Sequence, residues 1–496
     1  MKLVNLSIAA AATCLLATSA YALKTEDRNV KGNYQVEYLK APGAVNSIGE
    51  MFTGGELYGR LRSNSFWWDW DNQNNGVTAD NNMWGLGGSL VYKTGFYKGF
   101  GATVGFYGTV PLHNDNKDGF NPTANYGKAG KDTYHTRADG SEGSIGVFAE
   151  AYGEYKAGKT DVKIGRQGID SIMLATNDTK MVPNTFEAAV IENKDIANTT
   201  VRAGYIMSQK LRDHQNFHSL IAFEKYNEND DSGAHKGLTP ALISGAGEDV
   251  NPEMVLLTAQ NTSIPDLKLN AEYVGVNGFV NTAIAEANYK IKVSDGWTLT
   301  PGIRYLRQMD DGAGAIGGAS LSGKFKGNTS YTGAKGGYTD PNSADGSIIM
   351  GRLVAANGPL ELTAGYSKIS DDADIIAPWR GFPTGGYTRS MAQVDWIANT
   401  KNWALKAVYD FGKAGLVSGF KVAADYENMN FDDAKAATSG FTDRDIFHVD
   451  MWKTFKAIPN AEFKLRFATV DAQPSTVGGI DYNSYNEYRF EINYLF

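Results

Sequence analysis

The sequence has little of what stabilises small secreted proteins or anchors helical membrane proteins. It contains one cysteine, Cys14, and 14 prolines in 496 residues. Because Cys14 is the only cysteine, the chain cannot form an internal disulfide. This excludes a secreted domain stabilised by disulfides. No window beyond residue 22 offers the ~20 apolar residues that a membrane-spanning helix needs. A net charge of −8 argues against nucleic acid as a partner.

Sequence motifs of catalysis and metal binding are also missing. No G-x-S-x-G or H-E-x-x-H occurs, and the histidines are His113, His135, His214, His218, His235 and His448. His214 and His218 have i,i+4 spacing, but the surrounding residues show no helical pattern, so a zinc site is not indicated. The stretch from Asp71 is only faintly similar to a calcium loop, because Asn82 stands where a bidentate glutamate should be. We therefore expect no enzymatic activity, no metal site and no cofactor.

The last stretch of the chain alternates strictly between two kinds of residue. Every second position up to the terminal residue is apolar: Tyr488, Phe490, Ile492, Tyr494 and Phe496. The positions between them are mostly polar or charged, which predicts a β-strand with one apolar and one hydrated face. Aromatic residues at both ends of the apolar row are typical of a membrane barrel strand. These five residues are expected to form the C-terminal signal that the barrel-assembly machinery recognises.

The first stretch indicates export. Residues 1–22 combine Lys2, an apolar run from Ile8 to Ala17 and the small-residue motif Ala20-Tyr21-Ala22, which together predict a cleaved signal peptide. Residues 23–50 are polar without a clear period. We interpret them as a periplasmic lead-in that can fold into the pore. Residues 51–496 are expected to form one transmembrane barrel domain.

From Gly54 onward the alternation of apolar and polar residues continues almost without interruption. Leu57, Gly59 and Leu61 share one face, and Tyr58, Arg60 and Arg62 share the other. In the second part of the chain, strands are predicted to begin near Phe186, Thr200, Glu253, Leu267, Thr282, Trp297, Ser347, Leu360, Met391, Trp403, Val417, Asp445, Ala461 and Tyr485. Short spacers such as residues 157–159 and 357–359 alternate with long Gly/Asn/Asp-rich ones such as 113–143 and 310–345.

This organisation predicts an all-β fold, a transmembrane antiparallel barrel of about 18 strands with short turns on one side and long loops on the other. A soluble propeller would show a repeat of about 40–50 residues, and none is present. An energised receptor would carry a large N-terminal plug domain, but here the strands begin near Gly54.

If the apolar rows face lipid, the opposite parity faces a water-filled lumen. A charge facing the bilayer midplane would cost ~2–4 kcal/mol, so the charged strand residues are expected to point inward. The predicted basic wall consists of Arg60, Arg62, Arg202, Arg304, Arg352, Lys406, Lys421, Lys464, Arg466 and Arg489. Two interpretations stay open: these residues pair with neighbouring carboxylates, as any wide barrel requires, or they form a track that guides anions.

Two segments break the alternation without being ordinary loops. One follows Gly165-Arg166-Gln167 and continues through residues 174–187, and the other covers residues 377–389. Both contain prolines, which cannot join a central ladder, so both are expected to leave the wall. A segment that folds into the lumen would narrow it.

The first of these segments resembles the OprD-type porin family of bacterial outer membranes. The resemblance is most specific over residues 174–187 and extends loosely from about Gly54 to Phe496. It implies an 18-stranded pore per chain in the outer membrane of Gram-negative bacteria, with a constriction made by inward-folded loops. Carried onto this chain, it places Asn177, Asp178 and Lys180 in the constriction loop and Arg380 and Arg389 in the second inward segment.

The chain departs from the family pattern at Lys180, where an arginine is expected, and at Ala188, where a glycine is expected. Asn177 and Asp178 also have a structural interpretation, since such residues commonly tighten turns. The expected function is passive diffusion of small hydrophilic solutes, with moderate selectivity for carboxylate-bearing ones such as amino acids or small organic acids. The alternative is a surface-exposed structural or adhesive protein with an occluded barrel. Outer-membrane lipid is an expected partner, and the chain is expected to be a monomer or a homotrimer.

Overall fold

The computed structural model describes residues 28–31, 34–71, 80–114, 133–136, 142–212, 214–223, 238–320, 335–391, 396–439, 441–473 and 484–496. The predicted signal peptide, residues 1–22, lies outside this range. So does most of the stretch between Asp71 and Asn82 that is faintly similar to a calcium loop.

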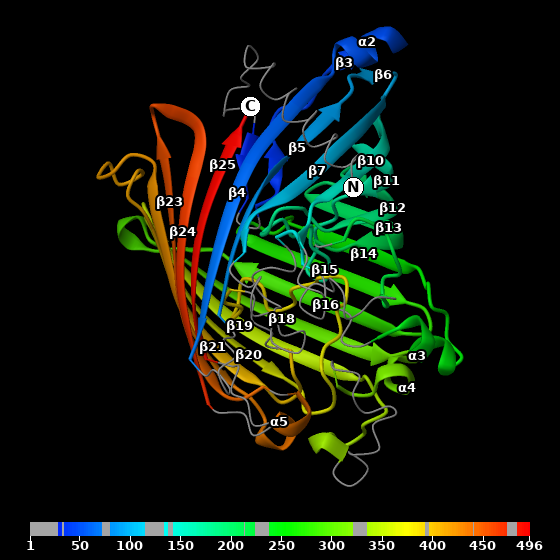
Figure 1. Ribbon diagram of the computed structural model, residues 1–496, viewed down its shortest axis with the longest axis vertical. Helices are drawn as coiled ribbons and strands as arrows, with labels where there is room; N and C mark the ends of the chain where they lie inside the picture. Colours follow the sequence, from blue (N-terminus) through cyan, green and yellow to red (C-terminus); the bar gives the residue numbers. More distant parts are fainter. Residues whose placement is uncertain are drawn as a thin grey trace.

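Eighteen long antiparallel strands form one closed barrel (Figure 1). These are β4 (Glu56–Trp70), β5 (Asn81–Lys93), β7 (Phe100–Asn114), β10 (Ile145–Ala157), β11 (Thr160–Gln167), β12 (Thr185–Asn193), β13 (Thr199–Lys210), β14 (Met254–Asn261), β15 (Leu267–Val276), β16 (Val280–Tyr289), β18 (Thr298–Asp310), β19 (Gly346–Asn357), β20 (Leu360–Ile369), β21 (Lys401–Asp410), β22 (Phe420–Asn430), β23 (Arg444–Phe455), β24 (Ile458–Ala472) and β25 (Tyr485–Leu495).

The last strand closes the barrel against the first. β25 pairs antiparallel with β4 along its whole length, from Tyr485 opposite Trp70 to Leu495 opposite Arg60. This closure leaves no open sheet edge, and an open edge in hydrocarbon would expose unpaired backbone N–H and C=O groups at a cost of several kcal/mol each. The closed ladder therefore fixes the β4–β25 seam as a necessary feature of the fold.

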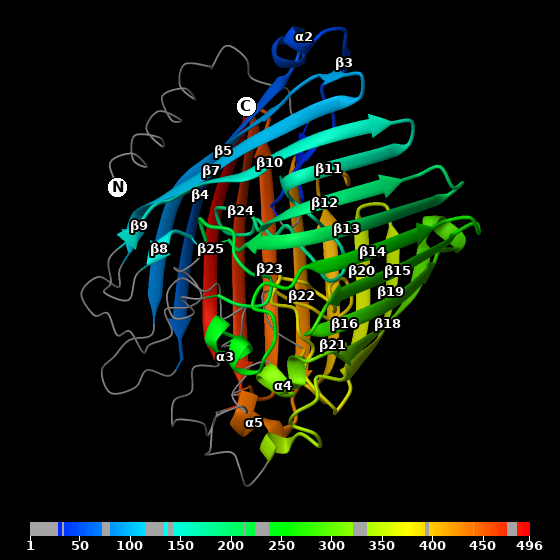
Figure 2. The same ribbon diagram turned by 90° about the vertical axis from the view of Figure 1, so that its right-hand side faces the viewer.

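Short elements lie at the two ends of the barrel, except for β1 and β2, which lie inside it. They are β1 (Arg28–Val30), β2 (Val36–Tyr38), β3 (Ala44–Val45), β6 (Phe96–Tyr97), β8 (His135–Thr136), β9 (Glu142–Gly143), β17 (Ile291–Lys292), α2 (Ile48–Thr53), α3 (Pro240–Gly245), α4 (Ala313–Gly317), α5 (Asp433–Ser439), η4 (Ser294–Gly296) and η6 (Lys335–Gly337). In Figure 2, α2 and the C-terminus lie at one end, and α4 and α5 lie at the other. We call these the short-turn end and the long-loop end. Within the described ranges, no helix is both long enough and apolar enough to cross a membrane.

The two faces of the wall differ as the alternation predicts. On β25, the side chains of Tyr488 and Phe490 are 42% and 36% exposed on the outside of the barrel, whereas Glu487, Arg489 and Glu491 are buried on the inside. The outer surface therefore presents apolar and aromatic groups to the surroundings, and the inner surface carries the charge. This arrangement suits a barrel surrounded by lipid.

The predicted strand beginnings agree closely with the structure, with one exception. Leu267, Leu360 and Tyr485 are the first residues of β15, β20 and β25. The strand predicted to begin near Met391 is wrong: Met391 belongs to a turn inside the segment between β20 and β21, and the next strand begins at Lys401. An apolar residue among polar neighbours predicts a strand edge, but here the side chain is buried by the inward fold of its own segment.

A hydrophobic core fills part of the lumen, which the alternation of inward and outward residues alone does not predict. Inward-facing residues near the long-loop end, such as Ile348 and Ile446, are fully buried. They belong to the same apolar cluster as Leu174 and Trp379 of the two segments that leave the wall. The inward segments are therefore held in place by hydrophobic burial as well as by polar contacts, at roughly 25 cal/mol for each Å² of apolar surface removed from water.

The lipid-facing position of Phe490 can be tested by placing a charge there. Because Phe490 lies midway along β25 and faces outward, Phe490→Arg should destabilise the folded barrel by ~2–4 kcal/mol, measured by urea unfolding in lipid bilayers. Glu361→Arg, at an exposed position on the inner wall, is the matched control and should change stability little. Equal destabilisation by both substitutions would contradict the assignment of the two faces.

Candidate pore constriction

Two segments leave the wall and enter the lumen from the long-loop end. The first covers residues 168–184 between β11 and β12. The second lies between β20 and β21 and is described over residues 370–391 and 396–400. The first is fixed to β15, where Glu272 accepts hydrogen bonds from the backbone N–H groups of Ile172 and Met173, each at 2.8 Å. Further along the segment, Asp178 contacts Arg60 and Arg62 of β4. Residues 168–184 therefore connect strands that lie far apart around the barrel.

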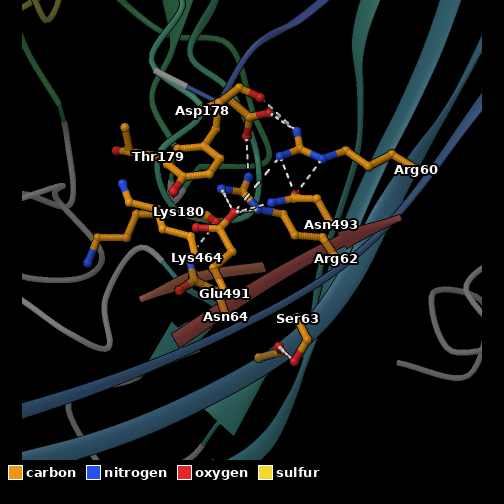
Figure 3. Close-up of polar contacts among 12 residues, drawn as sticks. Arg60, Arg62, Ser63, Asn64, Asp178, Thr179, Lys180, Lys464, Glu491 and Asn493 are labelled. Atoms are coloured by element: carbon orange, nitrogen blue, oxygen red, sulfur yellow. Dashed lines mark hydrogen bonds and ion pairs between the residues drawn. The ribbon is translucent and has the colours of Figure 1, made fainter. Parts of the chain in front are cut away.

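Asp178 forms the central contact of the first segment (Figure 3). Arg60 Nη1 donates to Asp178 Oδ2 at 2.7 Å, and Arg62 Nη1 donates to Asp178 Oδ1 at 2.8 Å. Arg62 also contacts Glu491 of β25 at 2.6 Å, and Arg60 Nε donates to Asn493 Oδ1 at 2.9 Å. The four charged side chains are at most 4% exposed. Two cations and two anions thus share one dehydrated cluster, and removing one partner would leave a buried charge uncompensated.

The two other predicted residues of this segment have different contacts. Asn177 Oδ1 accepts hydrogen bonds from the backbone N–H and the Oγ1 of Thr179, at 3.1 and 2.7 Å. This is the turn-tightening role of an asparagine. Lys180 places its Nζ 3.9 Å from the ring centroid of Phe66, and its carbonyl accepts a hydrogen bond from Asn64. Asp178 and Lys180 contact β4, whereas Asn177 contacts only its own segment in the bonds described, and all three are buried.

The second segment packs against the first and against the wall. The backbone N–H of Phe382 donates to the carbonyl of Ile172 at 3.1 Å, so the two inward segments touch within the lumen. Arg304 of β18 donates to the carbonyl of Pro383 at 2.6 Å. Seven residues after Pro383, the backbone N–H of Ser390 donates to Glu427 of β22 at 2.9 Å. The second segment therefore follows the inner wall from β18 to β22.

Arg380 and Arg389, the two predicted cations of this segment, are both half-buried. The guanidinium carbon of Arg389 lies 3.8 Å from the ring centroid of Phe382. Arg380 has a φ of 65°, a left-handed conformation that costs a non-glycine residue roughly 1–2 kcal/mol. Residues persist in such conformations only when their surroundings over-determine them.

The long-loop end of the second segment is fixed by a buried lysine. Lys435 of α5 forms ion pairs with Asp371 and Asp432, and its ammonium lies 5.1 Å from the ring centroid of Tyr338. Burial acts to raise the pKa of Asp432, but hydrogen bonds from Asn399 and Lys435 outweigh it and hold that pKa below its usual value. Three long connections of the barrel therefore meet at one charged cluster.

Most of the predicted basic wall is neutralised by carboxylates. Ion pairs join Arg60 and Arg62 to Asp178 and Glu491, Arg202 to Glu192, Arg304 to Glu286, Lys464 and Arg466 to Asp450, and Arg489 to Glu487. Arg352 donates to the carbonyl of Gly386 and to Asn288, and Lys421 lies over the ring of Trp452. Among the residues that the structure describes, Arg352, Lys406 and Lys421 are the predicted wall cations outside any ion pair.

The sequence placed Glu272 on the inner face and left pairing with carboxylates open, but it did not identify which carboxylate pairs with which wall cation, nor one aromatic contact. Glu487 and Glu491 share their parity with Arg489, so their pairing with inward cations could have been anticipated. Glu272, which holds the first segment, gives no local signal of its partners, because they lie about a hundred residues away in the chain. Tyr34 also lies inside the barrel, where the guanidinium carbon of Arg62 is 5.0 Å from its ring centroid.

The described ranges contain no group of three or more His, Cys, Asp or Glu residues arranged to hold a metal ion. His214 and His218 do meet, with 2.7 Å between Nδ1 of the first and Nε2 of the second, and both rings pack near Phe223. This geometry is that of a hydrogen-bonded, aromatic-packed pair.

The Asp178 cluster can be tested by removing one negative charge. Asp178→Asn keeps the shape of the side chain but leaves Arg60 and Arg62 with one carboxylate between them. The anion-to-cation permeability ratio should rise about two- to threefold, measured as a reversal potential in a salt gradient. Asp195→Asn, in an exposed turn, is the control and should leave the ratio unchanged. No change in the Asp178 variant would show that these guanidinium groups do not act on permeating ions.

Comparisons with known proteins agree with this architecture. The model of the family described as outer membrane porin, OprD family, matches residues 52–494. OccAB3 of Acinetobacter baumannii superposes with a TM-score of 0.68 at 15% identity, covering 89% of this chain and 99% of that chain. OccK8 (OprE) of Pseudomonas aeruginosa superposes with a TM-score of 0.67 at 16% identity, covering 90% and 99%.

OpdK of Pseudomonas aeruginosa, whose structure was determined with vanillate, superposes with a TM-score of 0.65 at 15% identity, covering 89% of this chain and 98% of that chain. Identities of this size show a common fold. No curated protein sequence matches this chain. Together with the closed 18-stranded barrel, the family match over residues 52–494 shows that the chain belongs to the OprD family of outer membrane porins and is a multi-pass β-barrel of the outer membrane.

Proposed function

We propose that the barrel is a diffusion pore for small hydrophilic solutes with a preference for those that bear a carboxylate. The observation that carries this proposal is the set of cations on the second inward segment and on the wall that it follows. Arg352, Lys406 and Lys421, which form no ion pair within the described part of the chain, lie on β19, β21 and β22. These strands belong to the part of the wall that the second inward segment follows. Arg380 and Arg389 belong to that segment itself, and each is half-buried.

The proposed mechanism is a partial exchange of hydration for protein contacts. A carboxylate that passes the second segment loses some of its water and gains contacts to guanidinium and ammonium groups. Conduction requires contacts strong enough for entry and weak enough for release. Several separate cations along the path meet this requirement better than one deep binding site.

The structure of OpdK determined with vanillate supports the choice of probes. Vanillate is an aromatic carboxylate, and the likeness of OpdK to this chain concerns the fold. We propose amino acids and aromatic or small aliphatic carboxylates as the first solutes to compare.

The alternative is a barrel that does not conduct and instead displays its long loops for adhesion or structure. One observation favours it: the two inward segments touch through Phe382 and Ile172, and the fully buried Trp379 packs in the hydrophobic core between them and the wall. A barrel closed in this way would give no current steps in a planar bilayer. Loop-dependent binding to cells would support this alternative.

We also propose that the outward row on β25 serves as the assembly signal. Tyr488, Phe490, Ile492 and Tyr494 alternate with inward polar residues, and Phe496 follows the end of the strand. The chain is proposed to work as a monomer or a homotrimer. Cross-linking in native membranes would separate these two states.

The pore itself predicts discrete conductance steps for purified protein in a planar bilayer. Arg380→Ala and Arg389→Ala should each lower the anion-to-cation permeability ratio about two- to threefold, because a cation is removed from the path. Lys413→Ala, in an exposed turn at the short-turn end, is the matched control. If the ratio stays constant in both arginine variants, neither residue belongs to the selectivity site.

A further inference from the structure

The first described residues of the chain, 28–31 and 34–38, form two short paired strands, here called the hairpin, that enter the barrel from the short-turn end. β1 and β2 pair antiparallel, with Arg28 opposite Tyr38 and Val30 opposite Val36. Arg28 fixes the base of the hairpin to the seam, because its Nη1 donates to the carbonyls of Gly59 and Phe496 at 3.1 and 2.8 Å. These two residues belong to the ends of the barrel chain that meet at the seam.

The tip of the hairpin places one aromatic side chain inside the basic wall. Tyr34 is 2% exposed, and its ring centroid lies 5.0 Å from the guanidinium carbon of Arg62 and 4.8 Å from the ammonium of Lys464. Cations over an aromatic face attract it by ~0.5–2 kcal/mol each, more where water is excluded. Arg60 also donates to the carbonyl of Tyr34 at 2.9 Å. Three wall cations from β4 and β24 therefore hold the tip.

The backbone conformation of Tyr34 indicates that this side chain does more than stabilise a turn. Tyr34 has a φ of 64°, which costs a non-glycine residue roughly 1–2 kcal/mol. Its hydroxyl is buried without a hydrogen-bond partner within the described part of the chain. A turn designed only for stability would carry glycine or asparagine here. Tyr34 therefore combines two unfavourable features, a strained backbone and an unsatisfied hydroxyl, with a ring that packs against two cations.

A cavity lies beside the hairpin inside the barrel. This cavity of about 160 Å³ is lined by Tyr38 of the hairpin, by Lys93 and Glu150 of the wall and by Asp178 of the first inward segment. The same arginine, Arg60, contacts both Tyr34 and Asp178. The hairpin and the first inward segment thus meet from opposite ends of the barrel at one point of the wall.

We propose that this hairpin is a third inward element of the pore and that the Tyr34 ring limits the width and the anion selectivity of the lumen beside the basic wall. The ring covers Arg62 and Lys464 and so keeps two cations from the permeating solute. This proposal rests on the pore function proposed above. The conductance of the wild-type protein is therefore measured first, since a wild-type barrel that does not conduct would overturn the pore function itself.

The test is a size series at position 34, recorded as single-channel conductance and reversal potential in planar bilayers. An aromatic side chain contributes ~150–250 Å² of surface, so Tyr34→Ala should raise the conductance about 1.5-fold or more and shift the selectivity toward anions about twofold. Tyr34→Trp should lower the conductance, and Tyr34→Phe should leave it close to wild type, because the ring is retained.

Phe52→Ala is the control, since Phe52 of α2 is an aromatic residue of the same N-terminal region that is 62% exposed. It should change neither conductance nor selectivity. If the alanine variant does not fold, the tryptophan and phenylalanine variants still test the proposal through their opposite expectations. A conductance independent of residue 34 would overturn it, whether or not thermal stability changes, because such a result would leave Tyr34 only a structural role.

Discussion

The closure of the backbone hydrogen-bond ladder between β4 and β25 is the constraint on which the structure depends. In hydrocarbon no water can satisfy an open edge, so the first and last strands must find each other across the whole length of the chain. The same seam also anchors the inward elements. Arg60 and Arg62 on β4 face Glu491 on β25, the first inward segment docks there through Asp178, and Arg28 fixes the hairpin to its end.

Charge neutralisation inside the wall follows from the same geometry. Inward segments exclude water from the wall that they cover, and a buried charge without a partner is costly. Most of the covered wall cations are therefore matched by a carboxylate, whereas the fully buried Lys210 donates to the carbonyls of Pro183 and Leu211. The carboxylate of Asp450 contacts Lys464, Arg466 and His448. The cations left outside ion pairs lie where the wall stays exposed, as at Lys406. Most charges of the wall therefore hold the inward elements in place.

The agreement between sequence and structure is greatest where local periodicity decides the outcome. A period of two assigns Leu465 and Phe490 to the outside and Lys464 and Glu491 to the inside without knowledge of any partner. It fails within the segment between β20 and β21, where Met391 was expected to begin a strand. There the backbone turns into the lumen and its side chains pack among residues distant in sequence, which no local pattern encodes.

The sequence by itself determined the barrel, its two faces and the order of short turns and long loops, because these follow from alternation and from the solvents on either side of a thin wall. Only the tertiary structure decided which charges are paired, how the two inward segments meet at Phe382 and Ile172, and that Tyr34 lies against Arg62 and Lys464. These contacts join residues tens to hundreds of positions apart. Their energies depend on the distance between side chains and on the loss of water around them, and both of these arise only once the barrel has closed.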